Sequence, residues 1–120
     1  MSNQIIAISE SIRPSKEIPF YTGDKESHDR YFKENYLDTG KCLSRSSVVS
    51  EDFLGVRFTS IWASNEDRLA FKADPVILAW LTLQTEHRKN NNISHRWVNR
   101  EIDNSEVITR EWTGEHWIEE

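Results

Sequence analysis

Apolar and polar residues alternate with a period of two in several segments of the chain, which predicts β-strands. The first segment begins with Ile5, Ile6, Ala7 and Ile8, so both of its faces start apolar, as in a strand that is covered on both sides. The alternation is regular in the third and fourth segments and weakest in the second. The four predicted strands are residues 4–13, 41–50, 56–63 and 93–102.

Helical spacing of the apolar residues predicts the elements between these strands. Residues 24–37 carry a stripe of aromatic side chains on one face, which predicts the first helix. A second helix starts at Ser64 and is interrupted at Asp74-Pro75. An Asp cap followed by Pro at the first helical position restarts a helix, so we expect a third helical segment from Pro75 to Asn90.

The predicted order of elements is strand, helix, strand, strand, broken helix, strand. This β-α-β-β-α-β order is typical of a ferredoxin-like α+β fold, a four-stranded antiparallel sheet with helices on one face. We assign residues 1–102 to this domain and residues 103–120 to a C-terminal tail, which forms an extra strand or an arm around a partner subunit. Helices cover only one of the two apolar sheet faces, and a second copy of the sheet is the simplest cover for the other. The pattern therefore predicts a homodimer.

Composition narrows the expected partners. The 120 residues carry a net charge of −5 with both signs mixed along the chain, and they lack the basic stripe of nucleic-acid-binding proteins. No apolar run reaches membrane-spanning length. The N-terminal residues do not form a signal peptide and Cys42 is the only cysteine, so we expect a reducing, cytoplasmic location without disulfides. We therefore predict neither a nucleic-acid nor a membrane partner.

Three local stretches resemble a known group of proteins. They are GKCLSRS leading into a strand (residues 40–46), FTSIW followed directly by a short helix (residues 58–62), and the Asp74-Pro75 break. Together with the element order, they resemble the dimeric α+β barrel superfamily, especially its antibiotic-biosynthesis-monooxygenase-like group, over about residues 5–102. The resemblance implies a ligand site between sheet and helices. Members include cofactor-free oxygenases of polycyclic phenols, haem-degrading enzymes and muconolactone-isomerase-like proteins.

Haem is the one cofactor that the resemblance suggests. Haem-degrading members use an Asn on the first strand, a Trp near the end of the third and a His on the second helix. Trp62 matches the Trp position and His87 is on the matching helix, so both are candidate ligand-binding residues. His87 lies far along that helix, however, and the first strand has no Asn at its centre. We therefore predict no cofactor, with haem binding or degradation as the least favoured alternative.

The fourth predicted strand carries the most interesting pair of side chains. Alternation places His95 and Trp97 on one strand face, and Trp62 can lie on an adjacent strand. This arrangement predicts a flat apolar pocket with one titratable group, suited to an aromatic ligand and to proton transfer by His95. In the alternative interpretation, the indoles fill a dimer interface and His95 makes a structural hydrogen bond. Tyr21 lies where a pocket mouth is expected, whereas His28 is expected to be ordinary core.

Two functions of different class follow from these features. The first is a cofactor-free monooxygenase-like enzyme, or a binder of a small aromatic molecule, with His95 as the proton-transfer group. The second is a non-catalytic dimeric assembly protein, in which Trp112 and Trp117 of the tail anchor on another surface. We expect no metal, because neither a His-x-x-x-His nor a Glu-x-x-His pattern occurs in the sequence.

Overall fold

The computed structural model describes residues 3–102 and 109–113, and it confirms the predicted α+β class. The strands are β1 (Gln4–Ile12), β2 (Cys42–Val49), β3 (Gly55–Trp62), β4 (Ser94–Ile102) and β5 (Thr109–Thr113). They form one sheet in the order β2-β3-β1-β4-β5, and every neighbouring pair is antiparallel. The order of the first four strands is compatible with a ferredoxin-like fold.

The helices begin where the sequence predicts caps. They are α1 (Lys25–Phe32), its π-helical continuation η1 (Lys33–Leu37), α2 (Asn65–Ala73) and α3 (Pro75–Asn90). The side chains of Asp24, Ser64 and Asp74 each accept a hydrogen bond from a backbone N–H in the first turn of the helix that follows. Among the described residues, no helix is long and apolar enough to span a membrane.

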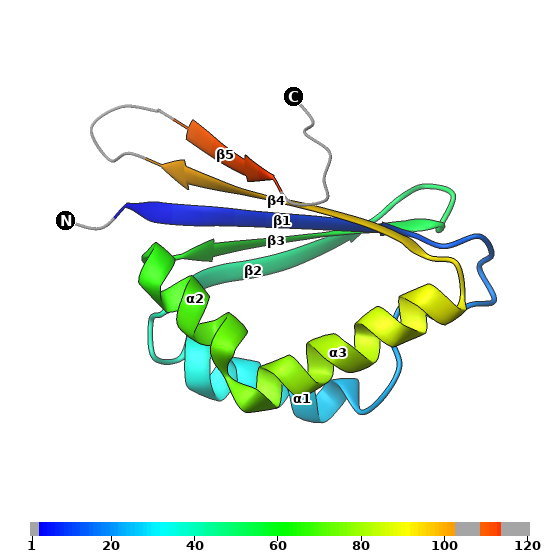
Figure 1. Ribbon diagram of the computed structural model, residues 1–120, viewed down its shortest axis with the longest axis horizontal. Helices are drawn as coiled ribbons and strands as arrows, with labels where there is room; N and C mark the ends of the chain where they lie inside the picture. The colour runs from blue at the N-terminus through cyan, green and yellow to red at the C-terminus, as the bar shows by residue number, and fades with distance from the viewer. Residues whose placement is uncertain (1–2, 103–108, 114–120) are drawn as a thin grey trace.

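All the helices lie on one face of the sheet (Figure 1). Between the two layers is a core of buried side chains from β1, β2, β3 and the helices: Ile5, Phe32, Tyr36, Cys42, Trp62 and Ile77. The opposite face of the sheet carries the alternate residues of each strand. Ile6 and Ile61, for example, are direct partners in the β1–β3 ladder and point away from the helices.

The strand β5 lies within the segment predicted as a tail, and it pairs with β4. Thr113 opposes Val98, and Thr109 opposes Ile102. The remainder of the tail, including Trp117, lies outside the described residues. Its predicted role as an arm around a partner subunit, with Trp112 and Trp117 as anchors, therefore stays a prediction.

Candidate functional site

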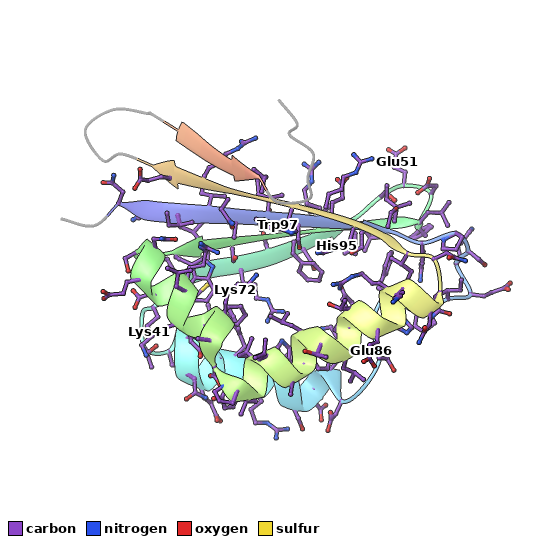
Figure 2. The ribbon with its side chains drawn as sticks, viewed as in Figure 1. Lys41, Glu51, Lys72, Glu86, His95 and Trp97 are labelled. Carbon is purple, nitrogen blue, oxygen red and sulfur yellow. The ribbon has the colours of Figure 1, made fainter. Side chains whose placement is uncertain are left out.

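A cavity of about 250 Å³ lies between the sheet and the helices. The ladders place Ser9 of β1 opposite both Phe58 of β3 and Trp97 of β4, and opposed residues of antiparallel strands share a face. These side chains form the sheet wall of the cavity, and residues of α1, α2 and α3 form the helix wall. Figure 2 shows His95 and Trp97 pointing from β4 toward the helices.

Four of the five predicted site residues line this cavity: Tyr21, Trp62, His95 and Trp97. Trp62 is only 2% exposed, and its indole N–H donates to Ser60 Oγ at 3.1 Å. Trp62 is thus buried against the helices of its own chain. The alternative that it fills a dimer interface is wrong, because the face that carries it is already covered.

The loop that carries Tyr21 is fixed by a buried glutamine of α3. Gln84 Oε1 accepts from the backbone N–H of Thr22 at 3.0 Å, and Gln84 Nε2 donates to the Thr22 carbonyl oxygen at 2.7 Å. The Tyr21 ring packs edge-on against Phe58, with centroids 5.7 Å apart. Its hydroxyl is buried without a hydrogen-bond partner among the described residues, and burial raises the pKa of Tyr21 to about 12. The phenol is therefore a neutral group available to a ligand.

His95 is held at the sheet wall by a neighbouring strand. Its Nδ1 lies 2.9 Å from Ser11 Oγ on β1. Burial, with smaller effects of Arg88 and Lys72, lowers the pKa of His95 to about 4. The imidazole is therefore neutral at pH 7 and can donate or accept a single hydrogen bond toward the cavity.

A second imidazole, which the sequence did not single out as a site residue, lines the cavity from the helix wall. His28 of α1 stacks on Trp80 of α3, with ring centroids 4.2 Å apart and planes 9° from parallel. It is 8% exposed, and its Nδ1 has no hydrogen-bond partner in the described part of the chain. Burial, followed by the positive charge of Arg45, lowers the pKa of His28 to about 4. The helical pattern shows His28 on the buried face, but it cannot show that this face borders a void.

The cavity is also rich in positive charge. Five cationic residues line it, against the single carboxylate of Asp29: Lys25, Arg45, Arg68, Lys72 and Arg88. Asp29 contacts Lys25 Nζ at 2.7 Å and Arg45 Nη1 at 3.6 Å. Arg68, Lys72 and Arg88 form no ion pair with any described carboxylate. Burial lowers the pKa of all three cations, although Lys72 as a whole residue is more exposed than Arg68 and Arg88.

The fifth predicted residue, His87, is not part of the site. It does not line the cavity, and its Nε2 donates to the carbonyl oxygen of Pro19 at 2.7 Å. The residue that a haem-degrading relative would use as ligand is therefore engaged with the loop, so the residues do not fit haem in that mode. Among the described residues, no group of three or more His, Cys, Asp or Glu gathers as a metal site. Cys42 is buried, and burial raises the pKa of its thiol.

Comparisons with protein-family models, curated proteins and solved structures found no match. The resemblance to the dimeric α+β barrel superfamily therefore stays a prediction.

Proposed function

We propose that this protein binds a small aromatic molecule in the cavity between its sheet and its helices. The observation that carries the proposal is a void with indole and phenol walls that also contains buried polar atoms without partners, Tyr21 Oη and His28 Nδ1. Apolar walls supply most of the binding free energy of such pockets, and a few fixed polar groups set the orientation of the ligand.

The size of the void sets the size of the ligand. An engineered protein cavity of about 150 Å³ lined by apolar side chains takes up benzene. The cavity of about 250 Å³ in this protein therefore suits a ligand of one or two rings with a polar substituent. A larger polycyclic substrate, such as the superfamily resemblance implies, needs the helices to move away from the sheet.

Binding is better supported than catalysis by His95. The enzymatic proposal, a cofactor-free monooxygenase-like reaction, needs His95 to accept a proton from the substrate. A general base works best when its pKa is near the working pH. With a pKa of about 4, the imidazole of His95 is a weak base at pH 7. The enzymatic role thus depends on a bound ligand that raises this pKa.

A cavity-filling substitution tests the binding proposal. In Ser9→Leu the new side chain enters the cavity, and in Ser46→Leu the same change falls on the other face, because Ser46 opposes Thr59. We expect the wild-type protein and Ser46→Leu to bind 2-naphthoate or 2-naphthamide at one site per chain in calorimetric titrations, and Ser9→Leu to bind neither. Absence of binding of both probes to the wild-type protein would refute the proposal.

A second candidate function, homodimeric assembly, is favoured by the opposite face of the sheet. Ile6 and Ile61 are half-buried there, and Val48 on β2 is 66% exposed. Apolar side chains on a helix-free sheet face are what an isologous sheet-to-sheet contact would cover. Assembly and ligand binding use different faces, so the two proposals do not compete.

A further inference from the structure

The cavity and the whole chain carry opposite charge. The chain has a net charge of −5, whereas the residues that line the cavity include five cations and one carboxylate. A concave site lined by one sign of charge concentrates ligands of the other sign. The lining of the cavity is therefore positively charged, although the protein as a whole is negatively charged.

The unbalanced cations are carried by α2 and α3. Asp29 offsets Lys25 and Arg45 on the α1–β2 side. On the α2–α3 side, Lys72 Nζ lies 5.7 Å from the centroid of the Trp97 ring, and Arg88 and Lys72 both act on the pKa of His95. Figure 2 shows Lys72 reaching from α2 into the space into which His95 and Trp97 point.

The partners of the two arginines are neutral. Arg68 Nε donates to Asn65 Oδ1 at 3.1 Å, and Arg88 Nη2 donates to Thr85 Oγ1 at 3.2 Å. A half-buried guanidinium that has only neutral partners has lost hydration without gaining a counter-charge. A bound anion would supply that counter-charge and form charge-assisted hydrogen bonds.

From this distribution we propose that the ligand is an aromatic anion, whose negatively charged group lies near His95, within reach of Lys72 or Arg88, while its ring lies between the indoles. This inference rests on the proposed binding function and specifies its ligand class. A second observation indicates a polar group elsewhere on the ligand: His28 on α1 is more than nine-tenths buried, and its Nδ1 has no hydrogen-bond partner in the described part of the chain. The cavity thus combines unbalanced cations, aromatic walls and a neutral polar group at His28.

A pair of probes that differ in charge and hardly in shape tests the ligand class. At pH 7 the carboxylate 2-naphthoate should bind at least about tenfold more tightly than the neutral 2-naphthamide, since charge-assisted hydrogen bonds are about twice as strong as neutral ones. Raising the salt concentration should weaken the binding of 2-naphthoate and leave that of 2-naphthamide nearly unchanged.

Substitutions of single cations locate the anionic end. We expect Lys72→Met and Arg88→Gln each to weaken 2-naphthoate binding by about fivefold to twentyfold and to weaken 2-naphthamide binding by clearly less. The matched controls are Lys41→Met, whose side chain lies away from the cavity in Figure 2, and Lys89→Gln, the neighbour of Arg88 that does not line it. Both controls should bind the two probes like the wild-type protein. Retained 2-naphthamide binding also shows that each variant is folded.

The outcomes separate this inference from the function on which it rests. Equal affinity for the two probes, or equal losses of both in the Lys72 and Arg88 variants, overturns the anionic ligand and leaves aromatic binding intact. Binding of neither probe to the wild-type protein overturns both proposals. If the Lys41 and Lys89 controls also lose the preference for 2-naphthoate, the negatively charged group lies elsewhere. That result would overturn its placement near Lys72 and Arg88.

Discussion

His28 and His95 are the two imidazoles that face the cavity, and each is near cations. Arg88 and Lys72 face His95, and Arg45 and Lys25 act on His28, where the carboxylate of Asp29 opposes them only in part. Burial, followed by these charges, holds the pKa of both imidazoles at about 4, well below the ordinary value near 6.5. A protonated form of either ring would be favoured only by a nearby negative group, such as an anionic ligand.

The two cavity histidines should make the folded protein less stable in acid. Both histidines have a pKa of about 4 in the folded protein and an ordinary value near 6.5 when unfolded, so the unfolded chain binds more protons between these values. The free energy of unfolding should therefore fall as the pH drops from 6.5 toward 4, by at most about 1.4 kcal/mol per pH unit for each histidine. Urea unfolding at pH 7, 5.5 and 4.5 measures this slope.

A double variant isolates the contribution of the two rings. His28→Phe with His95→Gln removes both titrating groups, so the slope between pH 6.5 and 5 should become shallower than in the wild-type protein. Parallel curves for the two proteins would show that these histidines are not the cause.

We also expect protons to be taken up when 2-naphthoate binds, because its carboxylate raises the pKa of a nearby imidazole.

At the scale of elements, the junction between α2 and α3 joins two of the helices that form the helix wall of the cavity. Asp74 ends α2 and caps α3, accepting from the Val76 backbone N–H at 2.9 Å. The same carboxylate accepts hydrogen bonds from the hydroxyls of Tyr31 and Tyr36. One side chain thereby ties α1 and η1 to the start of α3, the helix that carries Trp80 over His28. The cap could be predicted from the Asp-Pro pair, but the two tyrosine contacts could not, since they join residues about forty positions apart.

This double role predicts an unusually costly cap substitution. Asp74→Ala removes the cap and leaves two tyrosine hydroxyls without their acceptor, so we expect a loss of about 2–4 kcal/mol in the free energy of unfolding. Ser64→Ala removes only the cap of α2 and should cost about 1 kcal/mol. Chemical denaturation of both variants measures the difference. A cost for Asp74→Ala no larger than for Ser64→Ala would contradict the anchoring role.

At the scale of the whole molecule, the helices lie on one face of the sheet, and no described helix covers the other face (Figure 1). The outward side chains of β1 and β3 include paired isoleucines, Ile6 and Ile61. Sheet-to-sheet packing of two copies would bury them without disturbing the cavity. The ligand site and the proposed dimer contact thus lie on opposite faces of the same sheet.

Light scattering tests the proposed dimer. The wild-type protein should have twice the 14.1 kDa mass of one chain, and Ile61→Lys should lower the mass toward that of a monomer. Leu78→Lys is the control, because Leu78 is an apolar residue on α3 that is 52% exposed and lies on the other side of the molecule. A monomeric wild-type protein, or equal masses for the wild-type protein and Ile61→Lys, would contradict this interface.

The sequence by itself determined the local elements and the faces on which their residues lie. Strand alternation placed His95 and Trp97 together, and the Asp74-Pro75 pair marked the helix break, because these features depend on backbone geometry within a few residues. Only the tertiary structure decided that the faces enclose a void, that His28 stacks on Trp80, and that His87 turns to the loop instead. Those outcomes depend on the distance and angle between α3 and the sheet, which are set by packing among residues far apart in the chain.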